Sequence, residues 1–147
     1  MTYRQTVVGV ISQGKEFLVV QKPHWKGYWD FPQGGVEKGE SLEQALRREL
    51  GEELNTQKFG EVIFTGITYK QPFSFETLKH YPNKGFIGKE LFYFVVSYLG
   101  NNEDIKLGDD LCDKKWCREE ELFKFTYQES REHLPGILEF MKLNKLI

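Results

Sequence analysis

Runs of apolar and β-branched residues bounded by turn residues predict several strands along this chain. Residues 3–12 are rich in β-branched side chains, and a turn at Ser12–Lys15 leads into a second strand, so we expect an initial hairpin. The segments predicted to form strands are residues 3–12, 16–21, 59–70, 91–99 and 114–117, with a short one at 30–33. Residues 91–99 are apolar enough for a buried central strand. Gly60 and Gly66 are expected to mark bulges.

Helical periodicity follows the first strands. The apolar positions at helical spacing are Leu42, Ala45, Leu46, Leu50 and Leu54. Ser41 is a suitable N-cap, and Gln44 completes a capping box. A terminal helix is predicted over residues 127–142, where Pro135 is expected to kink the helix or delay its start. The turn-rich segment 71–89 predicts a long functional loop. Together these elements indicate an α/β chain with a mixed sheet between helices.

Three acidic residues continue the apolar stripe of the first predicted helix. Glu49, Glu52 and Glu53 lie at i, i+3 and i+4, and therefore on one side at about 100° per residue. Arg48 falls on the opposite side and is expected not to neutralise them. Partly buried carboxylates repel by roughly 4 kcal/mol per pair at ~4 Å and an effective dielectric near 20. A bound divalent cation offsets such repulsion, because carboxylate oxygens are ligands that Mg²⁺ prefers.

A glycine-rich loop precedes this helix, and Gly34, Gly35 and Gly39 allow its backbone to approach a ligand closely. The loop and the helix together resemble the Nudix box, G-x5-E-x7-R-E-U-x-E-E-x-G-U, in which U is a bulky aliphatic residue. The residues that carry the resemblance are Gly34, Glu40, Arg48, Glu49, Leu50, Glu52 and Glu53. Asn55 and Thr56 depart from the final glycine and aliphatic positions. Asn is the next most suitable residue at a left-handed helix end.

The resemblance to the Nudix family implies a fold and a chemistry. The family fold is an α/β/α sandwich with a mixed β-sheet and the box as a loop-helix-loop, here as a single domain over residues 1–147. Family members hydrolyse a nucleoside diphosphate linked to another group, using Mg²⁺ or, as the alternative, Mn²⁺. The resemblance makes Glu49, Glu52 and Glu53 the catalytic ligands of that cation. The resemblance also implies that a backbone carbonyl of Gly34 or Gly35 is a further oxygen ligand of the cation.

Two further roles follow from the resemblance. Arg48 and Glu40 are expected to pair and to hold the loop against the helix. The general base in this family comes from the box or from a carboxylate on a later loop. Asp109 and Asp110 precede the predicted strand 114–117, and Asp110 is our choice of base. The alternative is that these acids only solvate a surface loop.

Two segments outside the box resemble one branch of the family, the RNA pyrophosphohydrolases and diadenosine tetraphosphate hydrolases. Residues 29–35, WDFPQGG, are similar to W-Q-F-P-Q-G-G of that branch. Tyr81-Pro82 and residues 87–94 are similar to its Y-x-L-P and I-G-Q-x-Q-x-W-F, with Lys89 and Leu91 replacing glutamines. With the box, the resemblance spans roughly residues 5–117.

Several residues become candidates for binding a nucleotide substrate. Segment 22–29, KPHWKGYW, combines lysines that suit phosphates with aromatic rings that suit a base, and its candidates are Lys22 and Tyr28. Its tryptophans have the alternative role of core aromatics. The branch resemblance adds Tyr81, Lys84 and Lys89. Tyr81 could equally cap its own loop.

The expected substrates are nucleotides with long phosphate chains. Asymmetrical hydrolysis of a dinucleoside tetraphosphate to ATP and AMP is the first hypothesis, and a triphosphate-ended RNA 5′ end is the second. A (deoxy)nucleoside triphosphate pyrophosphatase is the third. A catalytically silent nucleotide-binding module is the alternative from another class, and the intact Glu49, Glu52 and Glu53 argue against it.

Composition excludes some partners. A net charge of −2 over 147 residues provides no basic field for general nucleic-acid binding, so nucleotide contact should be local to a site. Cys112 and Cys117 lack a metal-type spacing, and two free thiols favour a cytoplasmic protein. No apolar run approaches the ~20 residues of a membrane span, and we expect no signal peptide. The protein is expected to be a monomer or a homodimer.

Overall fold

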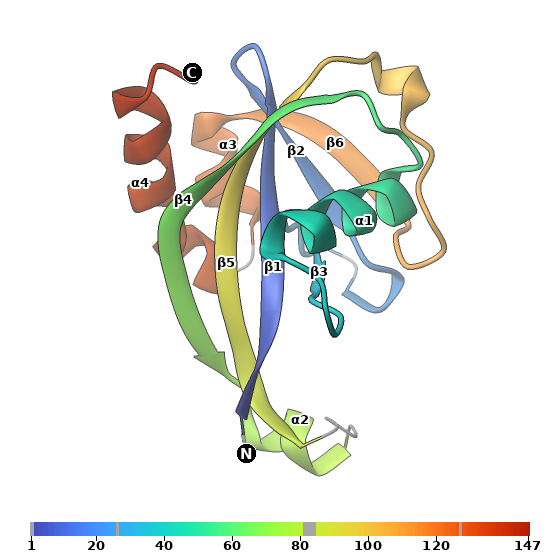
Figure 1. The fold of residues 1–147 in the computed structure, drawn as a ribbon, viewed down its shortest axis with the longest axis vertical. Coiled ribbons are helices and arrows are strands. Elements are labelled where there is room, and N and C mark those ends of the chain that lie inside the picture. The colour runs from blue at the N-terminus through green and yellow to red at the C-terminus, as the bar shows by residue number, and fades with distance from the viewer. Residues whose placement is uncertain (1, 26, 81–84, 127) are drawn as a thin grey trace.

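The computed structural model describes residues 2–25, 27–80, 85–126 and 128–147 (Figure 1). Its strands are β1 Thr2–Gln13, β2 Glu16–Gln21, β3 Gln33–Gly35, β4 Phe59–Pro72, β5 Phe86–Tyr98 and β6 Asp113–Arg118. Its α-helices are α1 Leu42–Leu54, α2 Phe75–His80, α3 Glu119–Phe125 and α4 Gln128–Leu143, with 3-10 turns at Pro23–Trp25 and Asn102–Asp104. No helix within these ranges combines the length and apolar composition that crossing a bilayer requires.

Within the described residues, the six strands form one mixed sheet. The strand order is β4-β5-β1-β2-β6, and β3 pairs with β1 off this path. The central strands β1 and β5 are parallel, whereas the other pairs are antiparallel. Gly14 has a φ of +62° in the turn between β1 and β2, where a residue without a side chain is favoured. The predicted hairpin and the mixed sheet are therefore confirmed.

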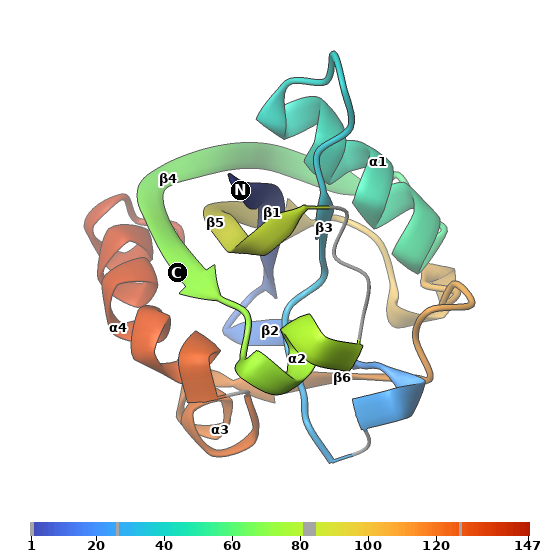
Figure 2. The ribbon, with the colours of Figure 1, turned by 90° about the horizontal axis from the view of Figure 1, so that it is seen from below.

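Helices cover both faces of the sheet (Figure 2). On one face, Ala45, Leu46, Leu50 and Leu54 of α1 pack against side chains of β1, β2 and β5. On the other, α3 and α4 contribute Leu122, Leu134, Ile137, Leu138 and Met141 to a second cluster. β1 supplies both clusters, because its successive side chains point to opposite faces: Val7 belongs to the first and Val8 to the second. The predicted α/β/α arrangement is confirmed.

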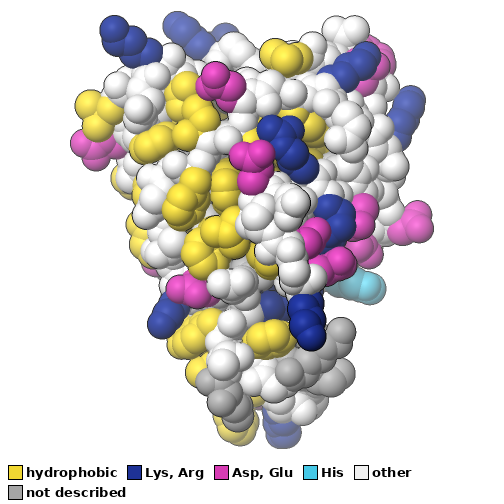
Figure 3. All heavy atoms as spheres, in the orientation of Figure 1, with side chains coloured by type: hydrophobic (Ala, Val, Ile, Leu, Met, Phe, Trp, Pro, Cys, Tyr) yellow, Lys and Arg dark blue, Asp and Glu magenta, His cyan; other side chains and the backbone are white. Residues whose placement is uncertain are grey.

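The strands β4 and β5 contain the predicted bulges. Their register shifts between Phe59 and Val62 and again between Phe64 and Thr68, which are the intervals that contain Gly60 and Gly66. Gly66 has a φ of +77°. On the face seen in Figure 3, hydrophobic side chains gather over β4 and β5, while acidic and basic side chains lie side by side over α1.

One local prediction was wrong, and one of two alternatives for another was excluded. Segment 71–89 was expected to be a long loop, but it contains α2 and the start of β5. The hydroxyl of Ser74 accepts a hydrogen bond from the backbone N–H of Thr77 (3.1 Å), so a local cap starts α2. Of the two alternatives for Pro135, a delayed start of α4 is excluded, because the helix begins at Gln128 and continues past the proline, and a kink stays a prediction. The neighbouring side chains of Leu134 and Ile137 are fully buried in the core, and this packing offsets the lost backbone hydrogen bond.

Candidate active site

The glycine loop reaches the site from between two strands. β1 and β2 pair only beside their turn, and farther along the segment 30–35 separates them. Val20 and Asp30 exchange two backbone hydrogen bonds (2.8 and 3.0 Å), while β3 places Gly34 opposite Val7. A Cβ atom at Gly34 would overlap the carboxyl group of Glu49. The missing side chain at Gly34 therefore lets Glu49 lie directly against the loop.

The caps of α1 orient the acids of the helix. The hydroxyl of Ser41 accepts from the N–H of Gln44 (3.1 Å), and the Gln44 side chain accepts from the N–H of Ser41 (2.8 Å), so the capping box is confirmed. Asn55 ends the helix in the left-handed conformation, with a φ of +53°. Its side chain also donates to the carbonyl of Lys106 (2.6 Å). Asn55 thus adopts the left-handed helix end that a glycine at this position would also allow.

Arg48 lies at the centre of the charged residues, and the prediction that it faces away from the acids was wrong. Its Nη1 donates to Glu49 (2.9 Å) and Glu52 (3.4 Å). Its Nε and Nη2 donate to the two oxygens of Glu40 (2.7 and 2.9 Å), and Nη2 donates to the carbonyl of Gly35 (2.9 Å). A helical wheel describes only the direction of Cβ, whereas a long arginine side chain can bend round the helix. Arg48 therefore offsets part of the repulsion among the acids.

The Glu40–Arg48 pair makes stability depend on acid pH. Two charge-assisted hydrogen bonds from Arg48 lower the pKa of Glu40 from 4.5 to about 2. The pair therefore stabilises the folded protein above pH 4.5 and loses its effect as the pH falls towards 2. We expect Glu40→Gln to lower the melting temperature most near pH 6 and least near pH 2. Glu43→Gln, which removes an exposed pair with Arg47, is the control. A Glu40→Gln deficit that is equal at all pH values would contradict this assignment.

Glu53 differs from the other acids of α1 because it is buried. Its side chain is only 9% exposed, and its Oε2 has no hydrogen-bond partner within the described residues. The pKa of Glu53 is raised from 4.5 to about 8, mainly by burial and with a contribution from the negative charges of Glu49 and Asp110, against an opposing effect of Lys22. Without a cation, Glu53 is therefore mostly protonated at neutral pH.

The three acids of the box fit a hard divalent cation as a donor set. Glu49 is partly buried, and burial raises its pKa against the opposing effect of Arg48, whereas the side chain of Glu52 is 61% exposed. Among the described residues, no three His, Cys, Asp or Glu side chains converge as a metal site. Glu49 and Glu52 are directed towards Arg48 instead. The buried Oε2 of Glu53 has no hydrogen-bond partner, so its negative charge is costly unless a cation or a proton neutralises it.

A later loop closes the carboxyl end of α1 and brings Asp110 near the site. The N–H groups of Lys106 and Gly108 donate to the carbonyls of Leu54 and Glu53 (2.9 and 2.8 Å), which the helix itself leaves without partners. A Cβ atom at Gly108 would crowd the carbonyl of Glu52, so the loop can approach because this residue is glycine. Asp110 is exposed, and its charge acts on Glu53. Its role as the general base stays a prediction.

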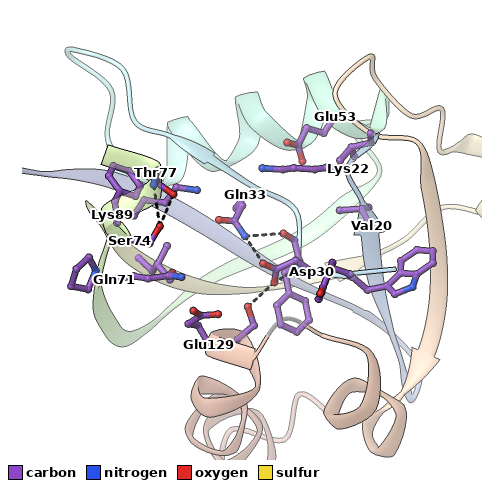
Figure 4. A pocket seen from close by; sticks show the side chains of 18 residues that line it. Val20, Lys22, Asp30, Gln33, Glu53, Gln71, Ser74, Thr77, Lys89 and Glu129 are labelled. Carbon is purple, nitrogen blue, oxygen red and sulfur yellow. Dashed lines mark hydrogen bonds between the residues drawn. The ribbon is translucent and has the colours of Figure 1, made fainter. Parts of the chain in front are cut away.

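A cavity of about 410 Å³ opens beside Glu53 (Figure 4). The residues that line it are Val20, Lys22, Tyr28, Trp29, Asp30, Phe31, Gln33, Glu53, Gln71, Pro72, Phe73, Ser74, Thr77, Lys89, Leu91, Leu111, Glu129 and Ser130. Three predicted substrate residues, Lys22, Tyr28 and Lys89, are among them. Tyr81 and Lys84 lie outside the described residues. The amines of two lysines, aromatic rings and the buried acid Glu53 thus share one cavity.

Several charged and polar groups line this cavity, and sequence reasoning singled out only some of them. Asp30 accepts hydrogen bonds from the Ser130 hydroxyl (2.7 Å), the N–H of Phe31 (2.8 Å) and the side chain of Gln33 (3.2 Å). Burial raises the pKa of Asp30, and the bond from Ser130 opposes this effect. Burial also lowers the pKa of Lys89, together with the neighbouring charge of Lys22. The WDFPQGG resemblance already contained Asp30 and Gln33, whereas no local pattern indicated Glu129 or Ser130.

Trp29 meets the core-aromatic alternative and also faces the cavity, while its contact with a base stays a prediction. It packs against the core cluster of α3 and α4, and it also lines the cavity. The amine of Lys115 lies 4.4 Å from the centre of its ring, a cation–π contact that helps to hold the ring in place.

Comparison with known proteins identifies the family. The family model described as NUDIX domain matches residues 2–137. The chain belongs to the Nudix family. Nucleoside triphosphatase NudI of Salmonella typhimurium is 33% identical over 118 residues, which cover 76% of this chain and 79% of that protein. The Salmonella heidelberg protein of the same name is 33% identical over 127 residues, or 82% and 85% of the two chains.

Solved structures agree with this Nudix assignment. An Ap4A hydrolase binary complex from C. elegans has a TM-score of 0.69 and 27% identity, and the match covers 95% of this chain and 98% of that one. The E. coli dihydroneopterin triphosphate pyrophosphohydrolase has a TM-score of 0.74 at 21% identity, over 90% and 94% of the two chains, which supports the fold alone. The predicted Nudix fold and enzyme class are confirmed. The chain is a Nudix pyrophosphohydrolase, and its branch within the family stays a prediction.

Proposed function

We propose that this Nudix enzyme hydrolyses nucleoside triphosphates to a nucleoside monophosphate and pyrophosphate. The cavity beside Glu53 carries the proposal, because its volume of about 410 Å³ lies near the lower end of small-molecule sites and suits one nucleotide better than two. The name nucleoside triphosphatase of relatives that are 33% identical supports the same choice. A (deoxy)nucleoside triphosphate pyrophosphatase was the third hypothesis from the sequence.

The residues of the site suit this reaction. We infer that Glu49, Glu52 and Glu53 hold Mg²⁺, with Mn²⁺ as the alternative, and that the cation supplies charge neutralisation and an acidified water. Lys22 and Lys89 line the same cavity and can bind phosphate oxygens electrostatically. Tyr28, which is 57% exposed at the cavity, offers a ring for a base. Asp110 is the proposed base for the attacking water.

Asymmetrical hydrolysis of a dinucleoside tetraphosphate is the second candidate. Two observations favour it: the 27% identity to the C. elegans Ap4A hydrolase over nearly the whole chain, and the WDFPQGG segment that supplies Asp30 and Gln33 to the cavity. In this reading the first nucleoside occupies the cavity, and the second extends from it past the exposed Tyr28.

Product analysis with Mg²⁺ tests the proposal. The purified chain is incubated with a set of nucleoside and deoxynucleoside triphosphates, with diadenosine tetraphosphate and with triphosphate-ended RNA, and all products are separated. We expect a monophosphate and pyrophosphate from the triphosphates at the highest kcat/KM. ATP plus AMP released fastest from the dinucleotide would establish the second candidate instead. Preferential release of pyrophosphate or phosphate from RNA would overturn both.

A further inference from the structure

Asn55 makes a side-chain contact that a glycine at the end of the Nudix box could not make. It ends α1 in the left-handed conformation, and its backbone N–H donates to the carbonyl of Gly51 (3.0 Å). Its side-chain Nδ2 also donates to the carbonyl of Lys106 (2.6 Å), which lies 51 positions along the chain. A glycine would supply the backbone conformation alone. The side chain of Asn55 therefore joins the box to a later loop, and the helix end itself does not need this bond.

The loop at residues 106–111 meets the end of α1 through Lys106. The N–H of Lys106 donates to the carbonyl of Leu54 (2.9 Å), and the carbonyl of Lys106 accepts from the side chain of Asn55. The donor and the acceptor of one residue are thus both bound to the helix end. A single hydrogen bond would let the loop pivot about one contact, whereas the second bond fixes its direction.

A tight turn then brings Asp110 towards the acids of the box. The N–H of Gly108 donates to the carbonyl of Glu53 (2.8 Å), and the N–H of Leu111 donates to the carbonyl of Gly108 (3.2 Å). Asp110 lies within this turn and is exposed, so the backbone of the loop, and not the packing of its own side chain, sets its position. Leu111 is buried and lines the cavity. The position of Asp110 therefore depends on how firmly the loop is held on α1.

We propose that Asn55 is a positioning residue, which holds the loop at residues 106–111 so that Asp110 stays beside the Nudix box. This inference rests on the proposed function, in which Asp110 accepts the proton of the attacking water. A general base must lie within hydrogen-bond reach of that water, and a small displacement of such a group is costly in rate. The departure of this chain from the family glycine thus adds a contact that serves the reaction.

Asn55→Gly tests the proposal, because glycine keeps the left-handed helix end and removes only the side-chain bond. We expect kcat to fall roughly 10-fold, with the melting temperature changed by about 5 °C or less. KM should stay within about 2-fold, because a base acts in the chemical step and not in substrate binding. Asn55→Asp should lower kcat as well, since a carboxylate cannot donate to the carbonyl of Lys106.

Asn144→Gly is the matched control. Asn144 is also an exposed asparagine just past a helix, and its side chain donates to the carbonyl of Phe140 (2.8 Å). It is not among the residues that line the cavity, so its replacement should leave kcat unchanged. An equal loss of kcat in Asn144→Gly and Asn55→Gly would overturn the proposal.

A double-mutant cycle shows whether Asn55 acts through Asp110. Asp110→Asn should lower kcat by itself, and Asn55→Gly should then have no further effect in that background. The same loss from Asn55→Gly in both backgrounds would overturn the proposal, and so would wild-type kcat in Asp110→Asn. The substrate is the nucleotide that product analysis shows to be hydrolysed fastest, so the cycle does not depend on which nucleotide that is.

Hydrogen exchange separates this proposal from the proposed function, because it needs no turnover. The amides of Lys106 and Gly108 should exchange roughly 2- to 10-fold faster in Asn55→Gly than in the wild type, the range for one lost hydrogen bond. Faster exchange in a protein that hydrolyses no nucleotide would show that Asn55 holds the loop and that the proposed function fails. Unchanged exchange would overturn the proposal even if triphosphates are hydrolysed.

Discussion

Replacement of Glu53 by glutamine is expected to lower kcat by roughly two to three orders of magnitude while the fold is retained. Glutamine has nearly the same shape, but it cannot provide the anionic oxygen that a divalent cation requires. Turnover of the best substrate with Mg²⁺ measures the effect, and circular dichroism reports the fold. Glu61→Gln, an exposed acid on β4, is the control. Activity near that of the wild type would show that Glu53 is not a cation ligand.

The same substitution should stabilise the protein when no cation is present. Because the folded-state pKa of Glu53 is raised, its protonated form contributes stability that is complete below pH 4.5 and is lost as the pH rises through about 8. The shift corresponds to about 5 kcal/mol. We therefore expect the cation-free melting temperature of Glu53→Gln to exceed that of the wild type by a margin that grows from pH 5 to pH 8.5. A margin independent of pH would contradict the burial of an ionisable group here.

Gly34→Ala is expected to reduce activity by about 10²-fold with little loss of stability. The new Cβ would overlap the carboxyl group of Glu49, which is the far end of a flexible side chain and can move aside. The fold can absorb that movement, but a displaced Glu49 no longer lies against the loop. The ratio of kcat in the variant and the wild type measures the effect, with melting temperature recorded in parallel.

Gly136→Ala is the matched control for this substitution. It also adds a single methyl group, but it lies within α4 and would meet Ile67 at an ordinary 3.7 Å. Helix propensity predicts that it raises stability by up to about 1 kcal/mol, and activity should not change. If Gly34→Ala behaves in the same way, the close approach of Glu49 to the loop has no functional role.

Sequence patterns predicted the local features, such as helix caps and strand bulges, that depend on residues close together in the chain. The capping box at Ser41 and the left-handed end at Asn55 are set by side chains within one turn of the helix, and both are present. The bulges near Gly60 and Gly66 follow from the backbone freedom of glycine. The resemblance to the Nudix box, carried by charged residues and glycines at fixed spacings, predicted the family and its fold.

What sequence patterns could not predict depends on long or distant side chains. The path of Arg48 follows from the positions of Glu40 and Gly35, which are known only when the loop has folded over the helix. The hydrogen bond between Asp30 and Ser130 joins the two ends of the chain. The Oε2 atom of Glu129 is buried without a hydrogen-bond partner, and Glu129 lines the cavity because the start of α4 lies there. No periodicity in the sequence reports such contacts.

The central claim is that Glu53 is a buried, protonated acid with one oxygen lacking a hydrogen-bond partner, and that a divalent cation converts it into a ligand. Proton release on cation binding tests it most directly, by calorimetric titration of Mg²⁺, and then of Mn²⁺, at pH 7 in buffers of different ionisation enthalpy. With a pKa of about 8 for Glu53, the wild type should release close to one proton per bound cation, and Glu53→Gln close to none. Binding without proton release in the wild type, or equal release in both proteins, would contradict the account.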